Sequence, residues 1–127
     1  MGVTMYLKSM RLFLLLAIAF SGWSTAARAD SLRWFITSDY QYTVSLEFYS
    51  QRYNRAWPGN GQVYVINDYN NHEYNLECET GEQICYGAWA RGNSNTYWGV
   101  GMNNSQRCSN CCGICGRGDM VGITLQP

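Results

Sequence analysis

Basic side chains and histidine are scarce in this sequence, and lysine is absent after residue 8. Residues 30–127 hold six arginines and nine acidic residues, which gives a net charge of −3 with the histidine neutral. A mildly acidic segment without a basic run argues against nucleic acids and anionic membranes as partners. His72 is the only histidine and has no recognisable nucleophile beside it, so little is present from which to build a catalytic triad. We therefore expect a protein that is not an enzyme.

The sequence also lacks an apolar run long enough to span a bilayer. Its apolar run, residues 12–20, is about half the length that a membrane-spanning helix needs. This run follows Lys8 and Arg11 and precedes an A-x-A sequence that ends at Ala29, which together are typical of a secretory signal peptide. We expect a signal peptide at residues 1–29, export to the periplasm or beyond the cell, and one domain at residues 30–127. A membrane anchor is the alternative that the short run disfavours.

No segment of the predicted domain shows a helical hydrophobic period. Short β-branched and aromatic runs alternate with Gly, Asn and Pro turns, which predicts an all-β fold of about six or seven strands: an antiparallel β-sandwich or small barrel, stapled by disulfides. Residues 42–48 alternate best, so we expect a sheet with one buried face and one wet face. The buried face would carry Tyr42, Val44, Leu46 and Phe48. Strands are predicted at residues 32–37, 42–48, 62–66, 72–77, 83–90, 96–102 and 120–125.

All six cysteines lie between residues 78 and 115. An even number of cysteines in a small exported chain indicates disulfides, although six cysteines allow fifteen pairings. Cys111 and Cys112 are adjacent, so each is expected to pair elsewhere. Cys78 and Cys85 either close a small loop with each other or cross to the C-terminal cluster. The predicted disulfide cysteines are Cys78, Cys85, Cys108, Cys111, Cys112 and Cys115.

The last four cysteines, C-x2-C-C-x2-C from Cys108 to Cys115, have two other interpretations. Thiolates at this spacing can hold zinc or an iron–sulfur centre, and a C-x-x-C is a redox motif when it opens a helix. The flanking Ser, Asn, Gly and Arg residues carry no helical pattern, and export favours disulfides over free thiolates. We expect structural disulfides, no metal and no cofactor, with redox or metal chemistry as the alternative.

Several short, distinctive motifs lie among and before these cysteines. They are G-E-Q-I-C-Y-G-A-W at residues 81–89, Y-W-G-V-G at 97–101 and the C-x2-C-C-x2-C cluster, with W-P-G-N-G-Q-V-Y at 57–64 as part of the same pattern. Over most of residues 30–127 the sequence resembles a family of small exported proteobacterial proteins of unknown function. The resemblance implies a bacterial, exported setting and brings no activity or catalytic residue.

Polar side chains around His72 give further candidates. Residues 67–71 (N-D-Y-N-N) are rich in oxygen ligands, but they lack the glycine and glutamate of a calcium loop, so a hairpin turn explains them better. His72 is expected on the surface of an edge strand rather than as a base or ligand. Alternating Glu73 and Glu77 fit a soluble strand edge. A glycosidase pair drawn from Glu73, Glu77, Glu79 and Glu82 is the less favoured interpretation.

Aromatic residues are the clearest excess, because residues 30–127 hold four tryptophans and nine tyrosines among many asparagines. Aromatic rings stack on the apolar face of sugars while amides and carboxylates bond to sugar hydroxyls. Trp34 and Trp89 are expected in the core. The exposed, ligand-binding residues are predicted to be Trp57, Tyr53, Tyr69 and Tyr97.

The sequence therefore favours an exported, non-enzymatic binding module that uses exposed aromatic residues, with a carbohydrate or cell-wall glycan as its ligand. The alternative is a structural or protein-interaction module of the envelope, such as an inhibitor, whose partner is an envelope protein. A thiol redox or metal-binding protein is the third hypothesis.

Overall fold

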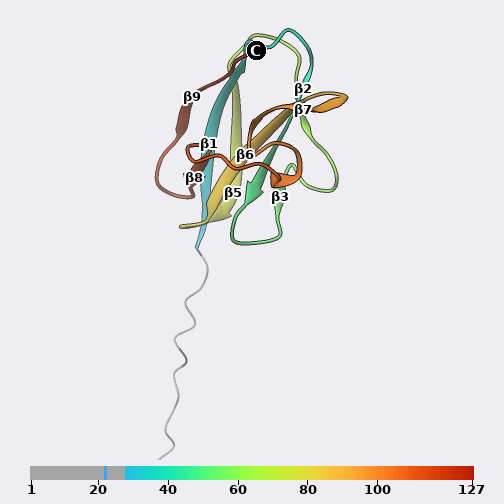
Figure 1. Ribbon diagram of the computed structural model, residues 1–127. Coiled ribbons are helices and arrows are strands. Elements are labelled where there is room, and N and C mark those ends of the chain that lie inside the picture. Colours follow the sequence, from blue (N-terminus) through green and yellow to red (C-terminus); the bar gives the residue numbers. More distant parts are fainter. Residues whose placement is uncertain (1–21, 23–27) are drawn as a thin grey trace, which may run out of the picture.

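The computed structural model describes Gly22 and residues 28–127, which fold into two facing β-sheets (Figure 1). The predicted signal peptide at residues 1–29 lies outside the described residues, apart from Gly22, Arg28 and Ala29. In the part of the chain that is described, no helix is both long and apolar enough to cross a membrane.

The described residues form nine strands and one short 3-10 helix, joined by turns and loops. In chain order they are β1 (Ala29–Ser38), β2 (Val44–Ser50), β3 (Ala56–Trp57), β4 (Tyr64–Ile66), β5 (His72–Glu79), β6 (Gln83–Ala90), β7 (Asn93–Gly99), η1 (Met102–Asn104), β8 (Cys112–Ile114) and β9 (Met120–Leu125). The seven predicted strands are all present. The two that the sequence did not reveal, β3 and β8, are two and three residues long, too short to display an alternating pattern.

The smaller sheet has the order β5-β1-β9, and the larger one has the order β3-β2-β6-β7, with β4 added to β2 and β8 added to β6. All pairs are antiparallel except β1 with β9, which is parallel. Strand β8, which precedes β9, belongs to the larger sheet. After β8 the chain crosses to the smaller sheet and then runs alongside β1. The all-β, mostly antiparallel sandwich is confirmed, and the sheets do not close into a barrel.

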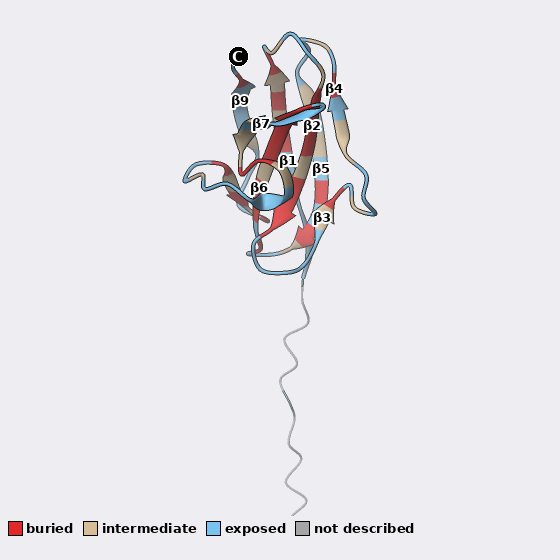
Figure 2. Cartoon of the chain, turned by 45° about the vertical axis from the view of Figure 1, so that its right-hand side comes forward, coloured by how far each residue is buried: buried red, intermediate tan, exposed pale blue. Residues whose placement is uncertain are grey.

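The main core lies between the two sheets. Trp34 of β1 and Phe48 of β2 have ring centroids 5.1 Å apart across this interface. Alternate residues of β1 and β2 point inward, as the two-residue period of a strand requires. Figure 2 shows the resulting buried bands along the strands. The fully buried large side chains of the core are Leu32, Trp34, Ile36, Val44, Leu46, Phe48, Ile66, Leu76, Ile84 and Leu125.

The expectation of one wet sheet face is wrong for β2, which is buried on both faces. Ser45 and Tyr49, on the face opposite Val44 and Phe48, are only 5% and 8% exposed. Tyr49 packs in a second small core with Cys85 and Val100, and its hydroxyl accepts a hydrogen bond from the backbone N–H of Asn103 at 2.9 Å. Burial raises the pKa of Tyr49 to about 12. The segment that follows β7 therefore forms a third layer over the larger sheet.

Three disulfides tie this layer and the strand ends together. Cys78–Cys115 joins β5 to the residue after β8, Cys85–Cys112 joins β6 to β8, and Cys108–Cys111 closes a local loop. No cysteine is left free in the described residues. Disulfides are thus confirmed, and the adjacent Cys111 and Cys112 do pair elsewhere. Of the two alternatives for Cys78 and Cys85, the crossing to the C-terminal cluster is the one observed.

Trp57 is not an exposed residue, contrary to the sequence prediction. It is only 7% exposed and belongs to the main core. The reason is strand β3, whose register places Trp57 opposite Phe48 of β2 and so on the inward face. Its indole Nε1 donates a hydrogen bond to the carbonyl of Glu77 at 3.1 Å, and the guanidinium of Arg55 covers its outer side 4.5 Å from the ring centroid.

We predict that Trp57→Ala lowers the free energy of unfolding by about 3–5 kcal/mol, because it empties a core site and leaves the Glu77 carbonyl without its donor. Urea denaturation measures the loss. Tyr69→Ala is the control, since the Tyr69 side chain is 64% exposed, and it should change stability by less than about 0.5 kcal/mol. Equal small effects in both variants would contradict the burial of Trp57.

Glu82 is the one buried carboxylate among the described residues, and it is 1% exposed. It closes the turn between β5 and β6. Its Oε1 accepts a long hydrogen bond from the backbone N–H of Glu79 at 3.5 Å, whereas its Oε2 has no partner. A buried charged oxygen without a partner destabilises the folded state.

We predict that Glu82→Gln raises the free energy of unfolding at neutral pH by about 1 kcal/mol, because it removes the buried charge and keeps one acceptor for Glu79. Urea denaturation at pH 7 measures the change. Glu77→Gln, on the exposed face of β5, is the control and should leave the free energy of unfolding nearly unchanged. A loss of stability in Glu82→Gln would show that the carboxylate has a partner after all.

Candidate ligand-binding end of the sandwich

Four segments meet at one end of the sandwich, at the top of Figure 1, where the C-terminus also lies. They are residues 39–43, 67–71, 91–92 and 126–127, and we call them the aromatic end. Strands β1, β4, β6 and β9 finish here and β2, β5 and β7 begin here. Two backbone hydrogen bonds fasten the segments, from Asp39 N–H to the Leu125 carbonyl and from Arg91 N–H to the Thr43 carbonyl, each 2.9 Å long. Loops that a sandwich brings together in this way are frequent binding sites.

A row of three aromatic rings supports this end. Tyr42 packs edge-on against Tyr40 with ring centroids 5.6 Å apart, and Tyr40 packs in the same manner against Trp98 of β7 at 5.1 Å. The indole Nε1 of Trp98 donates to the Gln126 carbonyl at 2.6 Å. The Tyr42 side chain is 64% exposed. The Tyr42 ring is thus open to solvent on one side, and on the other side it is supported by Tyr40, which itself packs on Trp98.

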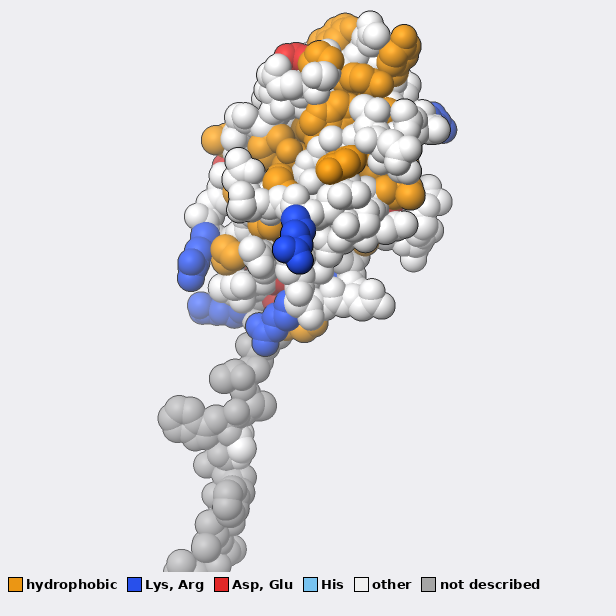
Figure 3. Space-filling model, in the orientation of Figure 1, with side chains coloured by type: hydrophobic (Ala, Val, Ile, Leu, Met, Phe, Trp, Pro, Cys, Tyr) orange, Lys and Arg blue, Asp and Glu red, His pale blue; other side chains and the backbone are white. Residues whose placement is uncertain are grey.

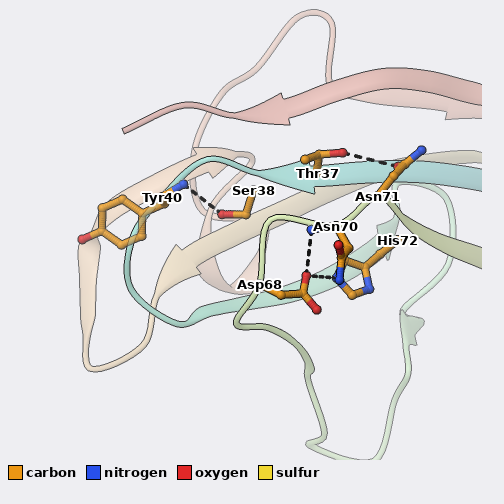
Figure 4. Close-up of polar contacts among 7 residues, drawn as sticks. All are labelled: Thr37, Ser38, Tyr40, Asp68, Asn70, Asn71 and His72. Atoms are coloured by element: carbon orange, nitrogen blue, oxygen red, sulfur yellow. Dashed lines mark hydrogen bonds and ion pairs between the residues drawn. The ribbon is translucent and has the colours of Figure 1, made fainter.

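The neighbouring loop, residues 67–71, is organised by one carboxylate (Figure 4). Asp68 Oδ1 lies 2.6 Å from Nε2 of His72 and accepts a hydrogen bond from the backbone N–H of Asn70 at 3.0 Å. These bonds hold the pKa of Asp68 below its ordinary value, with the His72 bond as the larger cause. The hydroxyl of Thr37 on β1 reaches Oδ1 of Asn71 at 3.5 Å. Tyr69 is left at the loop tip with its side chain 64% exposed.

On the face drawn in Figure 3, hydrophobic side chains gather over the upper half of the molecule, which includes the aromatic end. Ser38 anchors the first loop from below, because its buried hydroxyl accepts a hydrogen bond from the backbone N–H of Tyr40 at 3.2 Å. Figure 4 shows this contact and the Asp68 contacts at neighbouring loops. The two exposed rings, Tyr42 and Tyr69, therefore stand on loops with fixed backbones.

The four residues predicted as a ligand-binding face do not form one face. Tyr69 lies at the aromatic end, whereas Tyr53 and Trp57 lie toward the opposite end of the sandwich, and Trp57 is buried. The hydroxyl of Tyr53 donates to Oε2 of Glu79 at 2.5 Å. Tyr97, 42% exposed, projects from β7 beside Trp89 of β6 on the outer face of the larger sheet. Trp34 and Trp89 are both buried, as predicted.

Sequence analysis missed Tyr40 and Tyr42. The prediction extended the alternation of β2 back to Tyr42 and so assigned that ring to the core. The strand begins only at Val44, and Tyr42 lies in the turn that precedes it. Ser38-Asp39, a pair typical of turns, marks the start of this loop, but the alternation of Tyr42 with Val44 hides where the loop ends.

Two surface hollows lie away from the aromatic end. The first, of about 570 Å3, is lined by Ala29, Asp30, Ser31, Arg55, Asn75, Glu77, Cys78 and Glu79. The second, of about 460 Å3, is lined by Gln51, Gln83, Cys85, Val100, Asn104, Gln106, Arg107, Cys108, Ser109 and Cys112. Across Gly22 and residues 28–127, no three His, Cys, Asp or Glu side chains converge as a metal site would require. The first hollow is acidic, and the second is rich in amides.

Comparisons with protein-family models, with curated proteins and with solved structures gave no match. The resemblance to a family of exported proteobacterial proteins therefore stays a prediction.

We predict that the pKa of Asp68 returns toward its ordinary value of about 3.9 in a His72→Phe variant, which keeps a ring beside Tyr74 but removes the hydrogen bond. Since the folded-state pKa is lowered, the stabilising effect of Asp68 is present above about pH 4 and is lost as the pH falls through the folded-state pKa. Carboxyl NMR titration reports the pKa. Thr37→Val, which affects only the bond to Asn71, is the control and should leave the Asp68 titration unchanged.

Proposed function

We propose that the protein is an exported, non-enzymatic binding module that takes a carbohydrate at its aromatic end. The observation that carries the proposal is the open ring of Tyr42, held through Tyr40 against Trp98. A ring that is fixed before binding loses little conformational entropy when a sugar stacks on it.

The polar groups beside the rings suit the same ligand class. Asn67, Asn70 and Asn71 are exposed on the loop that carries Tyr69, and side-chain amides offer both donors and acceptors to sugar hydroxyls. Asp39 adds an exposed carboxylate from the neighbouring loop. Rings for the apolar face of a sugar and amides for its edge thus occur on adjacent loops of one end.

Two features support export. Three disulfides in one small domain are typical of proteins that fold in an oxidising compartment. Residues 1–29 also have the pattern of a signal peptide. A binding module in the periplasm or outside the cell would meet cell-wall glycans, which supply the ligand class that the aromatic end suits.

A second candidate is a protein-interaction module of the envelope, favoured by the acidic hollow at the opposite end. Asp30, Glu77 and Glu79 line that hollow with Arg55 as its only basic side chain. Such a surface suits a partner with lysine or arginine side chains. The two functions use different ends of the molecule, so variants can separate them.

The test is a titration of the purified protein with soluble cell-wall and plant oligosaccharides, in which tryptophan fluorescence is the signal that reports binding. Trp98 lies at the base of the aromatic row, so we expect the emission to shift on binding and the shift to diminish in Trp98→Phe. Tyr42→Ala should weaken binding about tenfold, which corresponds to about 1.4 kcal/mol. Tyr53→Ala, an exposed aromatic residue away from this end, is the matched control and should bind as the unmodified protein does.

Each variant needs a denaturation curve, so that a lost signal is not mistaken for a lost fold. Equal weakening by Tyr42→Ala and Tyr53→Ala would remove the aromatic end as the site. If no oligosaccharide binds and the protein instead retains a basic envelope protein that Glu77→Gln releases, the second function replaces the first.

A further inference from the structure

The Cys108–Cys111 disulfide differs from the other two bridges in what it holds together. Cys78–Cys115 and Cys85–Cys112 join residues that are 37 and 27 positions apart, and both involve strands of the sheets. Cys108 and Cys111 are only three positions apart, with exposed Ser109 and Asn110 between them. Loop-closure entropy makes a bridge that closes a long loop more stabilising than one that closes a short loop. The short bridge is thus the one whose opening disturbs the fold least.

The two sulfur-bearing residues of this bridge are unequally accessible. Cys111 is 4% exposed, whereas Cys108 is only partly buried and lines the amide-rich hollow. A thiolate that enters the hollow can reach Cys108, whereas Cys111 does not line it. Cys85 and Cys112 line the same hollow, but their bridge closes a longer loop and stabilises the fold more. The rate of thiol–disulfide exchange depends on which sulfur can be reached, so Cys108 is the point of attack and Cys111 is the leaving thiol.

The surroundings of the bridge also suit its reduced form. The Arg107 side chain is exposed, precedes Cys108 and lines the same hollow, and a neighbouring cation favours a thiolate. Asn110 Oδ1 lies 3.6 Å from Cys108 Sγ and 3.9 Å from Cys111 Sγ. After reduction this amide oxygen is an acceptor in place for a thiol S–H.

We infer that Cys108–Cys111 is a thiol-exchange site that accepts two electrons from a dithiol partner while the other two disulfides and the fold remain intact. One thiolate of the partner attacks Cys108 Sγ, the bond between Cys108 and Cys111 breaks, and Cys111 leaves as a thiolate that takes up a proton. The second thiol of the partner, deprotonated, then attacks the mixed disulfide and releases Cys108. The partner ends as a disulfide and the chain as a dithiol, so electrons and protons balance.

The inference does not depend on carbohydrate binding, because the hollow and the aromatic end are formed by different residues. Its occupant is a dithiol that fits a hollow of about 460 Å3, such as a cysteine pair on an extended peptide. Four of the side chains that line this hollow are amides. Gln51 and Asn104, which both line this hollow, bond to each other at 3.3 Å. Amides at that position can instead bond to a peptide backbone.

The first experiment treats the oxidised protein with limiting dithiothreitol, traps thiols with iodoacetamide and maps the labelled peptides by mass. We expect label on Cys108 and Cys111 alone, with the near-ultraviolet circular dichroism of the folded protein retained. First labelling at any of the other four cysteines overturns the inference. So does simultaneous labelling of all six cysteines with loss of the dichroism. This experiment requires no variant, so a folding defect cannot obscure it.

The second experiment tests whether Cys108 is the accessible sulfur, the property from which its assignment as the point of attack follows. Cys111→Ser leaves Cys108 free, and Cys108→Ser leaves Cys111 free. We expect the Cys108 thiol to react with oxidised glutathione at least about tenfold faster than the Cys111 thiol, because it is the accessible one. Equal or reversed rates overturn the assignment. The double variant Cys108→Ser/Cys111→Ser is the matched control, and it should stay folded and consume no dithiothreitol at the limiting concentration.

Discussion

The packing of β1 against β2, with Trp34 against Phe48 at its centre, is the contact on which the other parts depend. It brings the two sheets face to face and fixes which side of every other strand points inward. Trp57 lies in the core because β3 pairs it with Phe48 of β2. Just beyond the end of β1, Tyr40 packs against the edge of this core, whereas Tyr42 is exposed. The aromatic end therefore lies at the edge of the same core that buries Trp34, Phe48 and Trp57.

A domain of this size buries only a modest core, and the chain compensates by using its C-terminal segment twice. Between Val100 and Cys112 the segment covers the outer face of the larger sheet, and from Met120 onward it supplies the third strand of the smaller one. The Cys78–Cys115 bridge lies between these two uses. Cross-linking here thus fixes the point at which the chain passes from one layer to another. Between Val100 and Met120 this segment has only a three-residue 3-10 helix and one three-residue strand, so the disulfides are a main constraint on its position.

Local patterns in the sequence predict the strands well and their surroundings poorly. Strand β6 is predicted from its first residue to its last. Its residues alternate between two faces, one with Ile84, Tyr86 and Ala88 and the other with Cys85, Gly87 and Trp89, and turns with glycine flank the strand. The burial of Tyr49 was not predictable, because its cover comes from residues about fifty positions later in the chain. The same limit applies to the cysteine pairing, to the parallel register of β9 and to Trp57, whose strand has only two residues. The candidate site was predicted in its chemistry, through Tyr69 and the asparagines, but not in its location.

The parallel pairing of β1 and β9 has a mechanical consequence. Residue 28 and the C-terminus lie at opposite ends of the described molecule, and the two strands that lead to them are neighbours (Figure 1). A force that pulls these two ends apart slides β1 along β9, so that the hydrogen bonds between them are loaded together instead of opening one after another. Tension applied between residue 28 and the C-terminus would thus load this strand pair in shear.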